Sequence, residues 1–120
     1  MLGFIEQQTI REKYKEQEKR AIKEYIANRG ALGIRQLKER SALSREQKAE
    51  YTAFVVEHKP LREENFYEFI SMRRALGIRL TRERSALARK QKAEYTAFVK
   101  KYQALRAKLR SDLKAGLAGR

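Results

Sequence analysis

The sequence predicts an all-α protein: a tandem helical repeat of antiparallel helical hairpins that ends in a long coiled-coil-like helix. Three observations predict this class. Charged residues make up 37% of the 120 residues and proline occurs once, a composition typical of helices. Apolar residues recur at steps of three and four along most of the chain. Two long stretches of sequence are also nearly identical. A chain of this length forms a single domain, residues 1–120, with a modest core.

The repeat has a period of 44 residues, and its copies span 15–58 and 59–102. They match at 24 of 44 positions, with 21 of these matches in the last thirty positions of the alignment. The run 47–55 recurs letter for letter as 91–99. Duplicated supersecondary units usually pack on each other, because neither copy buries its apolar face alone. Residues 103–120 follow the second copy as a basic helical extension.

The first expected element is an amphipathic helix from Phe4 to about Arg29. Gly30 and Gly33 favour a stop or a hinge after it, and a second periodic stretch begins at Ile34. Short connections at the glycines and at Pro60 would give antiparallel hairpins. One continuous coiled coil is the alternative, if Gly33 and Gly77 remain helical.

The next helix should begin near Pro60, because proline suits the first turn of a helix, and it should run through Phe66 to Ile70. Beyond Gly77 the apolar stripe continues to Leu117 at spacings that resemble a coiled coil but are too irregular for strict heptads. This stripe consists of Leu87, Gln91, Tyr95, Phe98, Tyr102, Leu105, Leu109, Leu113 and Leu117.

Positive charge is concentrated in the C-terminal half. The net charge is +14, and from Ser71 onward 15 basic residues face only three acidic ones. A polyanion is the natural partner of such a surface, so we expect DNA or RNA to bind. The sequence has no helix-turn-helix, zinc-finger or RNA-recognition signature, so the contacts should be mostly to phosphates. The expected contact residues are Arg79, Arg82, Arg84, Arg89, Lys90, Lys92, Lys100, Lys101, Arg106, Lys108 and Arg110.

Several polar residues are retained in both copies, although core packing does not require them. We interpret them as a repeated surface, used twice against a repetitive partner; it comprises Arg35, Arg40, Arg45, Gln47, Lys48 and Gln91. Pairing within one helix, for instance Arg35 with Glu39, is the competing interpretation. The retained surface also supports an alternative function, a protein-interaction adaptor or inhibitor that docks helical hairpins on an acidic or helical protein of a nucleoprotein machine. A homodimer is a further alternative, because a thin core gains from a partner.

The aromatic residues lie at helical core spacing. Tyr51, Phe54, Tyr95, Phe98 and the cluster 66–69 are therefore expected to pack inside the protein. Stacking on unpaired bases is the alternative role, because basic residues are interleaved with these aromatics.

Enzymatic chemistry is not expected, and neither a cofactor nor a metal is implied. The chain has no cysteine and a single histidine, His58, and no catalytic or metal-ligand spacing stands out. No apolar run approaches the roughly 20 residues that span a bilayer. The N-terminal residues turn acidic too early for a signal peptide, so a cytoplasmic location is expected.

The run Glu83–Tyr95 resembles the Arg/Ala/Glu-rich helical stretches of plasmid mobilisation relaxases, and Glu39–Tyr51 resembles them more faintly. In that family these stretches lie outside the nuclease domain, among regions for DNA processing and transfer. The metal-binding histidine cluster of the family has no counterpart here, so no catalytic residue is carried over. The resemblance implies a mobile-element origin and an accessory role near DNA.

Overall fold

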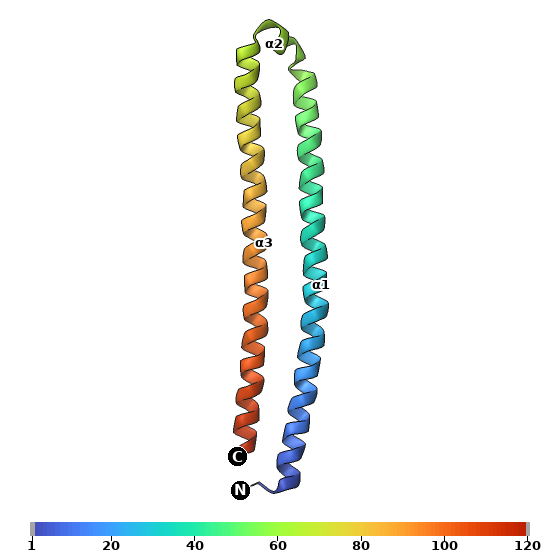
Figure 1. Ribbon diagram of the computed structural model, residues 1–120, viewed down its shortest axis with the longest axis vertical. Helices are drawn as coiled ribbons and strands as arrows, with labels where there is room; N and C mark the ends of the chain where they lie inside the picture. The colour runs from blue at the N-terminus through green and yellow to red at the C-terminus, as the bar shows by residue number, and fades with distance from the viewer. Residues whose placement is uncertain (1, 120) are drawn as a thin grey trace. The chain divides into compact units, whose positions relative to one another are not determined.

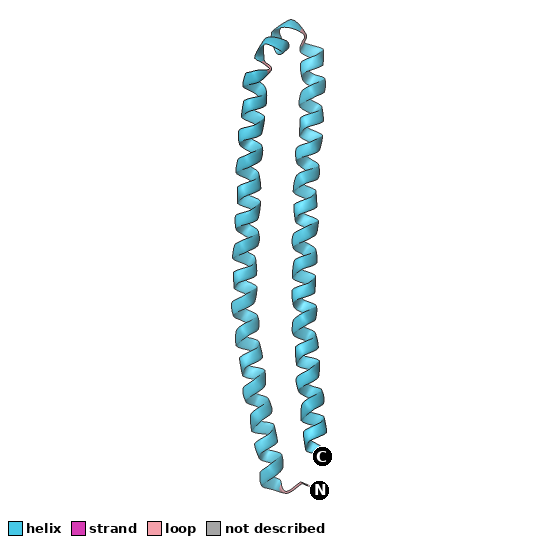
Figure 2. Ribbon diagram, turned by 180° about the vertical axis from the view of Figure 1, so that it is seen from behind, coloured by secondary structure: helices cyan, strands magenta, loops and turns pink. Residues whose placement is uncertain are grey.

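The computed structural model describes residues 2–119, which form three helices: α1 (Phe4–Glu57), α2 (Lys59–Glu64) and α3 (Phe66–Leu117) (Figure 1). Figure 2 shows these helices joined by short loops, and residues 2–119 contain no strand. The predicted all-α class is therefore confirmed. The contacts divide the chain into two units. Unit 1 comprises the residues up to Gly33 and those from Glu94 onward, and unit 2 comprises Ile34–Ala93.

The glycines do not interrupt the helices. Gly30 and Gly33 lie inside α1, and Gly77 lies inside α3. The expected break after Arg29 is therefore wrong, and the alternative in which these glycines remain helical describes both long helices. All three glycines are exposed, and a Cβ added to any of them would meet nothing within 4 Å. A glycine costs a helix about 1 kcal/mol relative to alanine, which the strong helix formers on either side readily offset.

The connection near Pro60 is confirmed as a boundary, but the helix that begins there is short. Pro60 lies in the first turn of α2, which ends at Glu64 instead of continuing through Phe66. Asn65 separates α2 from α3. Its Oδ1 accepts the backbone N–H of Glu68 at 3.2 Å, and its Nδ2 donates to Glu68 Oε2 at 3.4 Å. Asn65 is therefore the N-cap residue of α3, and its cap fixes the start of the helix at Phe66. The backbone N–H of Asn65 itself donates to the carbonyl of Leu61, at the end of α2.

The inward-facing side chains recur with a period of 11 residues. In α3, Leu80, Gln91, Tyr102 and Leu113 are all buried or half-buried. This period corresponds to 3.67 residues per turn, close to the 3.6 of an undistorted α-helix. It explains why the spacing failed to fit heptads. The repeat of 44 residues is four such periods, so equivalent residues of the two copies keep the same angular position on their helices.

The core is thin in both units. Ala21, Phe69 and Leu80 are the buried hydrophobic residues of the described chain, at 5%, 2% and 7% exposure. Gln47 and Gln91 are equally well buried, each at 5%. Among residues 2–119, no helix contains an apolar stretch long enough to cross a membrane.

Candidate nucleic-acid interface

Two glutamine-centred contacts join α1 and α3 in unit 2. Gln47 Nε2 donates to the carbonyl of Leu80 at 2.9 Å, and its Oε1 accepts Arg84 Nη1 at 3.0 Å. Gln91 Nε2 donates to the carbonyl of Gln36 at 2.8 Å, and its Oε1 accepts Arg40 Nη1, also at 2.8 Å. In both side-chain amides the nitrogen donates a hydrogen bond and the oxygen accepts one, as is usual for buried polar groups.

The two contacts are equivalent under the repeat. Gln47 and Gln91 are separated by 44 residues, as are Arg40 and Arg84. Each glutamine bonds to a carbonyl and an arginine that belong to the other copy. The copies therefore contact each other through the same surface, which is the rule that governs a symmetric homodimer interface.

These contacts correct the interpretation of the repeated surface at two of its residues. Gln47 and Gln91 lie inside the interhelical contact, so their assignment to an exposed surface is wrong. They are retained because their amides satisfy backbone and guanidinium groups of the opposite copy. Arg40, Arg45 and Lys48 are exposed, as expected.

The competing interpretation, pairing within one helix, is confirmed for Arg35. Its guanidinium lies 2.8 Å from Glu39. The equivalent residue, Arg79, lies 3.0 Å from Glu83 and also pairs with Glu50 on α1. Exposed pairs of this kind contribute roughly 0–1 kcal/mol each.

The candidate phosphate contacts of unit 2 fall into two groups. Arg79, Arg84 and Lys90 are exposed but already bonded; Lys90 Nζ lies 3.7 Å from Glu39, for example. The other group comprises Arg82, Arg89 and Lys92. Each is exposed, and none has an ion-pair or hydrogen-bond partner among the described residues.

Unit 1 divides in the same way. Lys100, Lys101 and Lys108 are exposed and have no ion-pair partner within residues 2–119. Arg106 is half-buried, 3.9 Å from Glu18 and 5.9 Å from the centre of the Tyr102 ring. The remaining candidate, Arg110, is exposed.

The Tyr14 hydroxyl donates to Glu18 Oε2 at 2.6 Å. This hydrogen bond, together with desolvation and the negative charge of Glu18, raises the pKa of Tyr14, while the nearby Arg110 opposes the shift. The Tyr14 hydroxyl is therefore uncharged at neutral pH, so it does not neutralise the positive charge of Arg110.

Beyond Ser71, two of the three acidic residues of α3 are half-buried. These are Glu83 and Glu94, whereas Asp112 is exposed, as is Glu68 near the start of the helix. Since Glu83 is also ion-paired, little negative charge remains on the outside of α3 beyond Ser71. This part of the helix thus presents mainly lysine and arginine, with Asp112 as its exposed carboxylate among residues 71–119.

The aromatic residues behave less uniformly than expected. Phe69 is buried as predicted, and Phe54 stacks on it with ring centres 5.7 Å apart. In unit 1, Tyr25 stacks on Phe98 at 5.1 Å and on Tyr102 at 4.1 Å. The prediction of core packing is wrong for four of these aromatics, namely Tyr51, Phe66, Tyr67 and Tyr95, which are 43%, 52%, 87% and 40% exposed.

A cavity of about 420 Å³ lies beside the stacked rings of unit 1. Glu24, Tyr25 and Asn28 line it from α1, and Lys101 and Tyr102 line it from α3. Asn28 and Glu24 did not emerge from the sequence as site residues. The sequence offered one indication for Asn28: in the alignment of the two copies, its equivalent is the apolar residue Met72.

The part of the chain that the structure describes contains no cluster of three acidic, histidine or cysteine side chains able to hold a metal ion. Comparisons with protein-family models, with curated proteins and with solved structures find no match to this chain.

Proposed function

We propose that this protein binds nucleic acid, mainly through phosphate contacts made by the exposed cations of α3. The observation that carries the proposal is the separation of charge on this helix. Two of its three acidic residues beyond Ser71 are half-buried, whereas most of its cations are exposed. A surface of one sign attracts a polyanion far more strongly than a surface of mixed charge.

Six cations are the principal contacts, because they are exposed and have no partner within residues 2–119: Arg82, Arg89, Lys92, Lys100, Lys101 and Lys108. Binding would proceed by release of counterions condensed on the nucleic acid, without reading base edges. The already bonded candidates, such as Arg79 and Arg84, would contribute less, since their guanidinium groups are partly used within the protein.

The salt dependence of binding tests this proposal. Six phosphate contacts predict that the affinity for labelled duplex DNA falls by about 10³-fold between about 50 and 200 mM salt. Fluorescence anisotropy measures this fall directly. Absence of binding at the lower salt concentration would contradict the proposal.

A matched pair of variants separates the α3 surface from total charge. Replacement of the six principal cations with alanine should abolish the steep salt dependence. The control replaces six exposed cations of α1, namely Arg11, Lys13, Lys15, Lys19, Lys23 and Lys38, and changes the net charge equally. It should retain most of the affinity. Equal losses in both variants would show that charge alone, and not α3, determines binding.

Within this proposal the chain is a tandem-repeat helical hairpin, with both copies in one domain and residues 103–120 as a basic extension. The contacts of Gln47 and Gln91 with the opposite copy support this arrangement. An accessory role near the DNA of a mobile element, as the likeness to relaxase stretches implies, agrees with non-specific phosphate binding.

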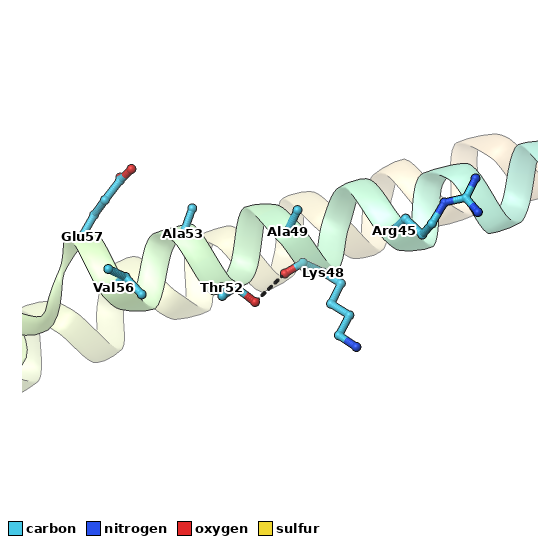
Figure 3. A pocket seen from close by; sticks show the side chains of 7 residues that line it. All are labelled: Arg45, Lys48, Ala49, Thr52, Ala53, Val56 and Glu57. Atoms are coloured by element: carbon cyan, nitrogen blue, oxygen red, sulfur yellow. Dashed lines mark hydrogen bonds between the residues drawn. The ribbon is translucent and has the colours of Figure 1, made fainter.

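A protein-interaction adaptor is the second candidate. One surface of α1 in unit 2 favours it (Figure 3): Ala49, Ala53 and Val56 form a shallow apolar strip, with Arg45 and Lys48 toward one end. Val56 is 68% exposed. Small residues let a second helix approach closely, and the two cations suit an acidic partner helix.

Substitution within the strip distinguishes the two candidates. Replacement of Ala53 with glutamate should abolish capture of a protein partner and leave nucleic-acid affinity nearly unchanged. Pull-down before and after nuclease treatment measures the first effect. Loss of every bound protein after nuclease treatment of the parent would contradict the adaptor role.

A further inference from the structure

The cavity of unit 1 has the dimensions of a ligand site. Its volume of about 420 Å³ falls within the range of roughly 300–1,000 Å³ typical of small-molecule sites. Its walls combine aromatic rings with a few polar groups, which is the usual composition of such sites. Tyr25 and Tyr102 supply the rings, Asn28 an amide, Glu24 a carboxylate and Lys101 an ammonium group.

Unit 2 provides an internal comparison, because the same positions of the repeat form its aromatic cluster. Tyr25 corresponds to Phe69 and Asn28 to Met72. Phe69 is only 2% exposed, whereas Tyr25 is half-buried. The chain therefore carries a hydroxyl and an amide around the cavity where the other copy carries apolar side chains. Packing does not require this polarity at these two positions, since Phe69 is almost fully buried in the equivalent cluster.

We propose that this cavity binds one nucleobase of single-stranded nucleic acid, with the adjoining phosphate on Lys101. This inference rests on the nucleic-acid binding proposed above. Tyr25 and Tyr102 already stack on each other, so a base would lie against the side of this pair that lines the cavity. Such contacts between a base and an aromatic ring tolerate different bases. Lys101 is exposed at the cavity and belongs to the same cationic surface of α3. A paired base inside a duplex cannot enter, so the site selects single strands.

The polar groups also define the base that fits best. The Glu24 carboxylate is an acceptor, and a carboxylate accepts a hydrogen bond from an exocyclic amine such as cytosine N4. The Asn28 amide both donates and accepts, so it can bond to a base edge. Glu24 and Asn28 lie four residues apart on α1 and thus share one face of the helix. A cytosine strand is the appropriate probe.

The repeat supplies the test variants. Asn28→Met introduces the residue that the second copy has at this position, so it fills the cavity with a side chain that the fold already accepts. Met72→Asn is the matched control, because it makes the reverse change in unit 2. Fluorescence anisotropy would measure binding of a short labelled oligo(dC) strand and of a duplex of equal length. Circular dichroism would verify that both variants remain helical.

We expect Asn28→Met to weaken binding of the single strand by on the order of tenfold, the value of one stacked base, and to leave duplex binding unchanged. Met72→Asn should match the parent on both ligands. Single-strand affinity that is unchanged in Asn28→Met, while the parent still binds both ligands, would overturn this inference and leave phosphate binding intact. A parent protein that binds neither ligand would instead overturn the proposed function itself.

The source of the base is tested with deoxycytidine monophosphate. If the site serves a strand, the mononucleotide should compete weakly, because it lacks the neighbouring phosphates that contact α3. Tight binding of the mononucleotide to the parent, lost in Asn28→Met and without effect on the bound strand, would identify a free nucleotide as the ligand and overturn the assignment to single strands.

Discussion

At the scale of single residues, the buried glutamines are the most instructive feature of the protein. Gln47 and Gln91 are as buried as the hydrophobic core, yet each bonds to a carbonyl and to an arginine of the other copy. Such a polar contact fixes which residues lie opposite each other, because a slip of the helices would leave two amides buried without partners.

Substitution of these residues provides a stability prediction. Gln47→Ala removes the partner of the Leu80 carbonyl and of Arg84, so the free energy of unfolding should fall by about 1–3 kcal/mol. Gln91→Ala should cost a similar amount, since its contacts are equivalent. The two sites are 11 residues apart along each helix, or about 16 Å, so the double variant should show the sum. Urea denaturation followed by circular dichroism measures the free energy of unfolding of all three variants. Clearly unequal losses in the two single variants would contradict the equivalence of the two contacts.

The helical spacing placed Gln91 in the apolar stripe, but both glutamines were also assigned to the repeated surface. That assignment followed side-chain type, since glutamine is usually exposed. Their position in the 11-residue period, in line with Leu80 and Tyr102, is the signal that would have placed them inside. The cavity residues Asn28 and Glu24 could not be identified in this way, because a cavity depends on which side chains lie opposite across two helices.

At the scale of secondary-structure elements, α3 begins directly after Asn65, whereas the long helices continue through their glycines. The sequence located the connection near Pro60, since proline is specific in its effect on helices. It favoured a stop or a hinge at Gly30 and Gly33, which remain helical, because a glycine signals a helix end only where the chain also needs a turn. It also missed the end of α2 at Glu64, because the N-cap residue Asn65 lies directly after a short helix.

The helical glycines predict stabilising substitutions. Gly33→Ala and Gly77→Ala should each raise the free energy of unfolding by about 0.4–1 kcal/mol, because the helix is retained and the unfolded chain loses freedom. Neither new methyl group would meet an atom within 4 Å. Gly116→Ala is the control: its Cβ would lie 3.2 Å from Ile10 Cγ2, so its gain should be smaller. A loss of helicity in Gly33→Ala would contradict the prediction.

The N-cap of Asn65 predicts a second effect on α3. Asn65→Ala removes the acceptor of the Glu68 N–H, and loss of such a cap costs about 1 kcal/mol. Asn65→Ser should restore most of the stability, because serine is an equally good N-cap residue and places no second carboxylate beside Glu68. The midpoint of thermal unfolding distinguishes the two variants. Equal midpoints for Asn65→Ala and the parent would show that α3 does not depend on this cap.

At the scale of the whole molecule, composition, apolar periodicity and the repeat predicted the all-α class, and the positive charge of the C-terminal half predicted a polyanion as partner. The structure adds where the charges lie. Glu83 and Glu94 are half-buried on α3, and Glu83 is ion-paired with Arg79, so the exposed charge of this helix beyond Ser71 is more positive than its sequence suggests. No count of residues could supply this, because it depends on which side of the helix each carboxylate occupies.

The reciprocal contacts between the copies also affect how this protein can change. If one copy had to pair with an identical second chain, every substitution would occur twice, at two equivalent contacts. When both copies belong to one chain, the residues of one contact can be substituted while those of the other contact stay the same. Position 28/72 shows the result: asparagine lines the cavity of unit 1, while an exposed methionine stands at the equivalent position of unit 2. Duplication thus lets one site acquire a new ligand while its twin preserves the fold.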